Sequence, residues 1–245
     1  MFSIVTALFN QVGYTQTFFE SIRKYSTQPY ELIVVNNGSS DTTRSWLKTQ
    51  KIDNLIDWPI NQGTTKAWNA GIKQAKHPYI CVLNNDLIVG PRWMDGLLET
   101  LRNAPADLAT LSPSCNGITH SINAENNAQS RKMFAIEASY IQSQPASLWP
   151  HSLIGSAIVI PRSTINTIGL FDERYFAWYN DLDYNLQIVA HGLKAYTTSK
   201  STIYHFGGAS SHDEYLKNIK EKDKNAFLAK WCQMKAFLDQ YYAAV

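Results

Sequence analysis

The feature that most constrains the fold of this 245-residue chain is an alternation of short apolar runs with helical patterns in its N-terminal third. The apolar runs lie at 2–8, 30–35, 54–58 and 79–83, and the helical patterns lie at 14–25, 42–48 and 66–76. Such alternation predicts βαβ units. We therefore expect an α/β fold with a mainly parallel central sheet and flanking helices.

The most distinctive run is Tyr79–Leu83, which is followed at once by Asn84, Asn85 and Asp86. An apolar run of this length indicates a buried strand. A parallel sheet brings the residues after each strand to its carboxyl edge, where ligands bind in open α/β folds. One carboxylate with two carboxamides suits a hard cation that phosphate oxygens also hold. A plain turn is the alternative interpretation of the same residues.

Three further polar clusters follow the other predicted strands, at Asn10, at 36–41 and at 61–66. Each cluster alone would be an ordinary turn. Because the carboxyl ends of parallel strands are neighbours in space, we expect all four clusters to form a single pocket.

Two groups in the second half could carry chemistry. Asp181 and Asp183 open a helical pattern at 180–190, directly after the aromatic stretch 176–179. Acids in a first turn can simply complement the helix dipole, whereas the functional interpretation is a general base in an aromatic-walled cleft. His205 precedes two glycines, and histidine is a common metal ligand, although a lone histidine is usually structural.

The rest of the chain is less regular. We expect a helix at 93–101, a strand at 108–111, long loops with short elements over 112–150, and a strand at 151–160 interrupted at Gly155-Ser156. Two short edge strands, 193–198 and 201–204, and a helix from 213 onward complete the prediction. The helix presents one apolar face, made by Phe227, Leu228, Trp231, Met234 and Leu238.

Composition narrows the function. The net charge of +2 does not indicate nucleic acid as the main partner. The three cysteines are odd in number and far apart, which favours reduced thiols and a cytoplasmic location. No apolar run approaches the length of a membrane span, and the first residues do not resemble a signal peptide.

The ordered motifs of this sequence resemble the family-2 inverting glycosyltransferases of the GT-A fold, in particular their rhamnosyltransferase-like members. The motifs are Val5–Asn10, Ile33–Asp41, Asn61-x-Gly63, Ala67-x-Asn69-x-Gly71, Leu83–Asp86, Gly155-Ser156, Gly169-x-Phe171-Asp172-Glu173, Asn180-Asp181-x-Asp183 and His205-x-Gly207-Gly208. The resemblance covers roughly residues 2 to 210.

The resemblance implies a single GT-A-type domain at 1–210, with a nucleotide-binding half at 1–111, an acceptor-binding half at 112–210, and a C-terminal helical extension at 211–245. It implies a hexosyltransferase of polysaccharide biosynthesis that uses a nucleotide-sugar donor, a glycan or glycolipid acceptor, and Mn²⁺ or Mg²⁺. No membrane span is expected, and a glycolipid acceptor allows peripheral membrane contact.

The resemblance also implies residue roles. The nucleotide-binding residues would be Thr6, Phe9, Asn10, Asn36, Gly63, Lys66, Asn69, Asn84 and Asn85. Asp86 and His205 would bind the metal, and Asp181 would be the base, with Asp183 as the alternative. The acceptor-binding residues would be Trp178, Tyr179, Gly155 and Ser156.

The sequence departs from the family pattern at four positions. Asn36 replaces the usual Asp that recognises the base, Asn84 replaces the first Asp of the D-x-D motif, Asn180 replaces the usual Glu, and Trp68 stands where Arg is frequent. These changes leave the nucleobase open and lower the negative charge available to a metal.

Two alternative functions stay open from the sequence. A sugar nucleotidyltransferase would use a similar sheet and a metal, but its triphosphate loop should carry a cation, and 10–13 after the first strand has none. A catalytically inactive sugar- or nucleotide-binding relative is favoured by the asparagines at 36, 84 and 180.

Overall fold

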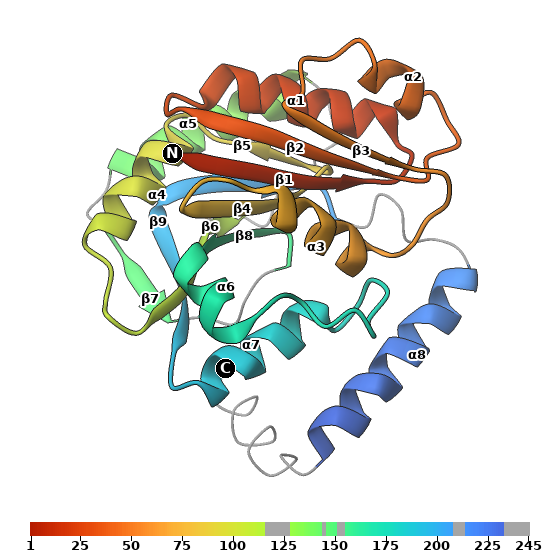
Figure 1. Cartoon of the computed structure of the whole chain (residues 1–245). Helices are drawn as coiled ribbons and strands as arrows, with labels where there is room; N and C mark the ends of the chain where they lie inside the picture. The colour runs from red at the N-terminus through yellow and green to blue at the C-terminus, as the bar shows by residue number, and fades with distance from the viewer. Residues whose placement is uncertain (116–127, 144–145, 151–154, 208–213, 233–245) are drawn as a thin grey trace.

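The computed structural model describes residues 1–115, 128–143, 146–150, 155–207 and 214–232. Helices cover both faces of a central sheet (Figure 1). The strands pair in the order β3-β2-β1-β4-β8-β6-β9-β5, with β7 paired to β9.

The strands are β1 Phe2–Leu8, β2 Tyr30–Asn37, β3 Asn54–Trp58, β4 Tyr79–Asn84, β5 Leu87–Val89, β6 Leu108–Cys115, β7 Leu148–Pro150, β8 Ala157–Pro161 and β9 Lys194–His205. The helices are α1 Val12–Tyr25, α2 Thr43–Leu47, α3 Thr64–Gln74, α4 Trp93–Arg102, α5 Ala128–Ser143, α6 Arg162–Ile168, α7 Asn180–Ala190 and α8 Glu214–Trp231.

The predicted α/β fold is confirmed, and the four strands predicted in the N-terminal third are parallel to one another. β1 pairs in parallel with β2 and β4, and β2 with β3. Beyond β4 the sheet is mixed, because β8 runs antiparallel to β4 and β6, while β9 runs parallel to β6. "Mainly parallel" therefore describes the first half only, as is common in large mixed sheets.

The core explains why β4 reads as an unbroken apolar run. Cys81 and Leu83 pack into the cluster that holds the inner faces of α1 and α4, whereas Ile80 and Val82 pack on the other side with α3 and α7. A strand buried on both faces needs apolar side chains at every position. Each such side chain contributes about 1.5–3 kcal/mol relative to an exposed position.

The prediction of loops with short elements over 112–150 is wrong for 128–143, which form α5. Phe134 and Ala138, one helical turn apart, are buried against Ile88 of β5. This contact is too narrow to produce a long apolar stripe, so the helical period does not stand out in the sequence. Residues 116–127 lie outside the described ranges.

The prediction of two short edge strands is also wrong, because 194–205 form one strand, β9, between β6 and β5. Its buried residues include Thr197, Thr198, Ser201 and Thr202. These polar residue types interrupt the apolar run by which a buried strand is predicted from sequence. The predicted strand at 151–160 begins only at Ala157. Gly155-Ser156 precede it rather than interrupt it, and 151–154 lie outside the described ranges.

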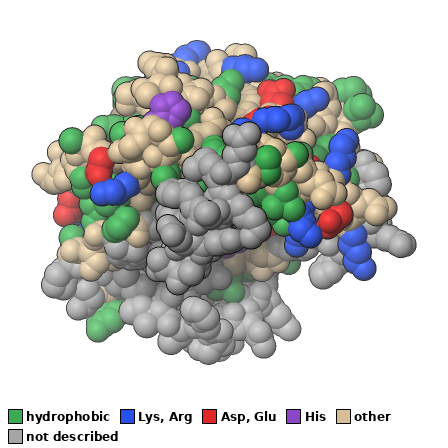
Figure 2. Space-filling model, turned by 90° about the horizontal axis from the view of Figure 1, so that it is seen from below, with side chains coloured by type: hydrophobic (Ala, Val, Ile, Leu, Met, Phe, Trp, Pro, Cys, Tyr) green, Lys and Arg blue, Asp and Glu red, His purple; other side chains and the backbone are tan. Residues whose placement is uncertain are grey.

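The predicted C-terminal helix is present as α8. Phe227 is buried, but Leu228 is 51% exposed, so the predicted apolar face is narrower than expected. Met234 and Leu238 lie outside the described ranges. Within those ranges, none of the helices has the length and apolar character to cross a membrane. Figure 2 shows Lys and Arg side chains interspersed with Asp and Glu on the described part of one face.

Candidate active site

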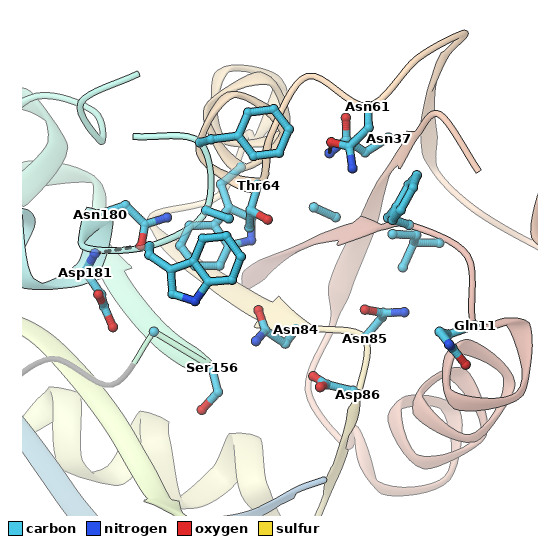
Figure 3. A pocket seen from close by; sticks show the side chains of 18 of the residues that line it. Gln11, Asn37, Asn61, Thr64, Asn84, Asn85, Asp86, Ser156, Asn180 and Asp181 are labelled. Carbon is cyan, nitrogen blue, oxygen red and sulfur yellow. Dashed lines mark hydrogen bonds between the residues drawn. The ribbon is translucent and has the colours of Figure 1, made fainter. Parts of the chain in front are cut away.

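A pocket of about 460 Å³ opens at the carboxyl ends of β1, β2 and β4. Its lining comes from both halves of the chain: Ala7, Leu8, Phe9, Gln11, Asn37, Asn61, Thr64, Trp68, Asn84, Asn85, Asp86, Gly155, Ser156, Phe176, Ala177, Trp178, Tyr179, Asn180, Asp181 and His205. Asn180 and Asp181 lie across the pocket from Gln11 and Asn85, as Figure 3 shows. The expected single pocket at the strand ends therefore exists.

Asp86 and His205 meet because their strands pair. β5 and β9 are antiparallel, with Leu87 opposite His205, and the Phe206 N–H donates to the Asp86 carbonyl at 2.9 Å. This register places His205 Nε2 3.0 Å from Asp86 Oδ1. Two residues that are 119 positions apart thus form one pair at the pocket.

Asn84 and Asn85 are fixed by neighbours on either side. The Asn84 N–H donates to the Ser156 carbonyl at 2.9 Å, which links the end of β4 to the residue before β8. Asn85 Nδ2 donates to Thr15 Oγ1 in α1 at 3.0 Å. Asn84 therefore lines the pocket from an anchored backbone position, and Asn85 with an anchored side chain.

Asp181 stands in the first turn of α7, next to Gly155. A Cβ at Gly155 would lie 2.7 Å from Asp181 Oδ2, so any larger residue there would displace the carboxylate from its present position. Burial raises the pKa of Asp181, while N–H groups of Leu182, Asp181 and Gly155 act in the opposite direction. A carboxylate with a raised pKa is a stronger base than an ordinary aspartate.

Asp183 does not line the pocket. Its side chain is fully buried and accepts hydrogen bonds from the Tyr175 hydroxyl at 2.9 Å and from Trp231 Nε1 at 2.8 Å. Lys230 Nζ lies 2.8 Å from Asp183 Oδ1. The structure thus separates the two acids, with Asp181 at the pocket and Asp183 in a buried network.

Several predicted nucleotide-binding residues also lie outside the pocket lining. Asn36 is fully buried; its Nδ2 donates to Asp57 Oδ1 at 2.7 Å, and its Oδ1 accepts from the Ser39 N–H at 3.2 Å. Asn69 is buried and exchanges hydrogen bonds with the Phe171 backbone, donating at 2.8 Å and accepting at 3.1 Å.

The other five members of that predicted set differ in position. Phe9 lines the pocket and is 38% exposed, whereas Thr6 is buried and Lys66 is exposed. Asn10 Oδ1 accepts from the Ser40 N–H at 2.8 Å and so holds the loop after β2. Gly63 takes a φ of 94° and packs against Phe176.

In two of the predicted clusters, the residues that line the pocket differ from those that the sequence prediction named. Asn37 and Asn61 line it and are joined by a hydrogen bond from Asn37 Nδ2 to Asn61 Oδ1 at 2.9 Å. β2 continues through Asn37, and side chains alternate along a strand, so Asn36 and Asn37 face opposite ways. The alternation of side chains along a strand was therefore the sequence signal that could have distinguished Asn37 from Asn36.

The residues at the pocket fit a divalent cation that is shared with a bound diphosphate. Within the described ranges, no three His, Cys, Asp or Glu residues group closely enough to bind an ion alone. Asp86 and His205 would supply one oxygen and one nitrogen donor, and phosphate oxygens of a bound ligand would supply others. Mixed oxygen and nitrogen donors suit Mn²⁺, and Mg²⁺ prefers oxygen.

Solved structures with a similar fold define the class. TarS of S. aureus, crystallised with UDP, superposes with a TM-score of 0.61 at 17% identity, over 83% of this chain and 59% of that chain. The mannosyltransferase PcManGT of Pyrobaculum calidifontis, solved with GDP-Man and Mn²⁺, gives 0.60 at 15% identity, over 85% and 57%. The fold is therefore that of the GT-A glycosyltransferases.

The family follows from the sequence. A family model described as glycosyl transferase family 2 matches residues 3–150, and the chain belongs to this family of enzymes. It is 25% identical over 235 residues to an uncharacterized glycosyltransferase, YwdF, of Bacillus subtilis, covering 90% of this chain and 83% of the relative. It is 23% identical over 244 residues to an N-acetylglucosaminyl-diphospho-decaprenol L-rhamnosyltransferase of Mycobacterium tuberculosis, covering 86% and 78%. The resemblance stated from the motifs is confirmed.

Proposed function

We propose that this chain is an inverting glycosyltransferase that moves a sugar from a nucleoside-diphosphate sugar to a hydroxyl of a glycan or glycolipid acceptor. The observation that carries the proposal is that Asp86, His205 and Asp181, which are distant in the chain, line one pocket. Family membership favours sugar transfer over nucleotidyl transfer.

Asp181 is the general base of the proposed reaction. Its carboxylate takes the proton from the acceptor hydroxyl, and the oxygen attacks the anomeric carbon on the face opposite the leaving group. The bond from that carbon to the diphosphate breaks, and the nucleoside diphosphate leaves with the bonding electrons. A positioned base of this kind contributes about 10²–10⁴ in rate. The raised pKa of Asp181 supports this role.

Asp86 and His205 are the proposed ligands of a divalent ion, Mn²⁺ or Mg²⁺, with Asn84 and Asn85 beside them. When bound, such an ion neutralises charge on the departing diphosphate. Asn84 carries no charge, so we expect the ion to bind weakly until the diphosphate supplies its own oxygens.

We assign the donor side of the pocket to residues 1–111 and the acceptor side to 112–210. Phe9, Asn37 and Asn61 line the donor side. Gly155, Ser156, Trp178 and Tyr179 line the acceptor side, and the two aromatic rings there offer surfaces on which a sugar can stack.

A glycolipid is the acceptor class that a relative supports, since the M. tuberculosis protein is named for a diphospho-decaprenol acceptor. We include peripheral membrane contact in the proposal for that reason. We also propose a cytoplasmic location, which agrees with three cysteines that form no disulfide.

The proposal is tested by thermal-shift measurements with UDP, GDP and dTDP, each with and without Mn²⁺, followed by NMR of the product formed from the matching nucleotide sugar. We expect one nucleotide to raise the melting temperature more with Mn²⁺, and the product to carry the inverted anomeric configuration. Retention of configuration contradicts the mechanism. Pyrophosphate release from a nucleoside triphosphate and a sugar phosphate identifies a nucleotidyltransferase. Binding with neither transfer nor donor hydrolysis identifies an inactive relative.

A further inference from the structure

The C-terminal helix α8 lies away from the central sheet, as Figure 1 shows, yet it contacts the pocket wall. Phe227 packs with Tyr175 and Leu186 in a small core, and its ring centroid lies 5.3 Å from that of Tyr179. Tyr179 lines the pocket and immediately precedes α7. The helix therefore touches the segment that leads to Asp181.

The strongest link is made by Asp223 of α8, which is 1% exposed. Its Oδ2 accepts hydrogen bonds from the backbone N–H groups of Phe176, Ala177 and Trp178 at 3.0, 2.9 and 3.0 Å. The Phe176 N–H also lies 3.0 Å from Oδ1. A carboxylate held by consecutive N–H groups forms charge-assisted bonds, which are roughly twice as strong as neutral ones.

A second link is made by Lys230, about two helical turns after Asp223 on α8. Lys230 Nζ lies 2.8 Å from Asp172 Oδ2 and 2.8 Å from Asp183 Oδ1. These two acids flank the pocket-wall segment Phe176–Tyr179, one before it and one after it. The helix thus holds the segment in the middle through Asp223 and at both ends through Lys230.

The opposite side of the segment is held by the start of α3. The Thr65 N–H donates to the Phe176 carbonyl at 3.4 Å, and Asn180 Nδ2 donates to Thr65 Oγ1 at 2.9 Å. All four residues from Phe176 to Tyr179 line the pocket. The segment is therefore a wall between α3 and α8, and Asp181 follows it by two residues.

We infer that Asp223 is a positioning residue: it fixes the backbone of Phe176–Trp178 and thereby sets the acceptor wall and the place of Asp181. This inference rests on the proposed function. A buried acid that merely anchored α8 could do so through any donor on the body of the protein. Asp223 instead binds the backbone of the wall itself, so its loss frees the wall as well as the helix.

The test compares Asp223→Ala and Asp223→Asn with a control, Glu221→Ala, two positions away on the same helix. Glu221 is exposed and pairs only locally, with Lys224 at 3.4 Å. Hydrogen exchange reports on the amides of 176–178, and steady-state kinetics report kcat and the KM values for donor and acceptor. Asp223→Asn keeps one acceptor oxygen and serves as the conservative variant.

For Asp223→Ala we expect faster exchange at 176–178 with unchanged exchange in β1 and β4, and kcat lowered by about 10- to 100-fold because the base is misplaced. The KM for the donor should stay within about twofold of that of the unsubstituted chain, because the residues on the donor side of the pocket are unchanged. Asp223→Asn should recover part of the lost kcat, and Glu221→Ala should match the unsubstituted chain.

The inference is overturned if exchange at 176–178 does not change, or if Asp223→Ala and Glu221→Ala have the same kcat. It is also overturned if both Asp223 variants lose cooperative melting, because the residue then serves stability alone. Failure of the proposed function appears differently, as absence of transfer by the unsubstituted chain. The exchange comparison would still decide whether Asp223 holds the wall.

Discussion

The two sides of the pocket are held together by different forces. The side formed by β1, β2 and β4 rests on an apolar core that buries both faces of these strands. The side formed by Phe176–Tyr179 packs on a small apolar cluster and is also held by the buried acids Asp223 and Asp183 and the partly buried Lys230. Apolar packing fixes the strand side of the pocket, whereas hydrogen bonds and ion pairs to charged side chains fix the Phe176–Tyr179 side.

This difference predicts different responses to substitution. An apolar core loses stability with the volume of the cavity that a substitution leaves, because neighbouring side chains collapse only partly into the space. A buried ionic network responds more abruptly, because removing one partner leaves the other charged and unpaired. Four substitutions, one of them measured in two ways, test the two sides of the pocket and the residues they position, and the first is expected to have the largest effect.

Asp181→Asn should lower kcat by about 10²–10⁴ while leaving nucleotide affinity unchanged, because it removes only the proposed base. Kinetics and calorimetric titration with the nucleoside diphosphate measure the two quantities. In the unsubstituted chain, kcat/KM should fall as the pH drops through the raised pKa of Asp181, since protonation removes the base. Near-full transfer by the variant would assign the base elsewhere.

Lys230→Met should lower the free energy of unfolding by about 3–5 kcal/mol, because the fully buried Asp183 loses its cation, whereas Asp172 keeps Arg174. Urea denaturation measures the change. The matched control is Lys224→Met, which breaks an exposed pair with Glu221 and should cost about 1 kcal/mol or less. Equal effects of the two substitutions would contradict the contrast between the two sides.

Asn69→Ala should destabilise the fold by about 2 kcal/mol, because the Phe171 N–H and carbonyl lose their buried partner. This residue joins α3 to the second half of the chain. Urea denaturation measures the cost, and calorimetry should find nucleotide affinity within about twofold of the original, since Asn69 lies outside the pocket lining. A large loss of affinity would restore its predicted role in nucleotide binding.

Asp86→Ala should weaken nucleotide binding by about tenfold or more in the presence of Mn²⁺, equivalent to about 1.4 kcal/mol. Without Mn²⁺ the variant and the original should bind alike, which provides the internal control. Calorimetric titrations with and without the ion make the comparison. Identical Mn²⁺ dependence in both chains would remove Asp86 from the proposed ligand set.

The smallest expected effect is on stability. Because folding raises the pKa of Asp181, its ionised form opposes folding at neutral pH. Asp181→Asn should therefore raise the free energy of unfolding by about 1 kcal/mol or less at pH 7. The gain should shrink as the pH falls through the raised pKa. A loss of stability at pH 7 would show that the carboxylate's hydrogen bonds outweigh its burial.

The same contrast explains what could be read from the sequence. Apolar runs identify β1, β2 and β4, because burial on two faces leaves a continuous apolar pattern. The polar residues after these strands identify the pocket edge. The sequence also named Asp86, His205 and Asp181, all of which line the pocket. Their roles stay predictions.

The other side of the pocket could not be read in this way. Asp223 lies among lysines and glutamates in a stretch that looks solvated, and nothing local marks it as buried. Its partners are backbone N–H groups 45 to 47 positions away. Strand β9 was predicted as two short strands, and the residues of helix α5 as loops with short elements. Residues with hydroxyl groups interrupt the apolar pattern of β9, and the buried apolar cluster on α5 is small.

Tyr179 combines an unfavourable backbone conformation with contacts to both α8 and the pocket. Its backbone takes a φ of 63°, a left-handed conformation that glycine would adopt more easily by roughly 1–2 kcal/mol. The contacts of the Tyr179 ring offset this conformational cost. The ring packs on Phe227 of α8, and Tyr179 also lines the pocket. A search for tighter or altered sugar selectivity should therefore start at this residue together with Phe227, varied as a pair.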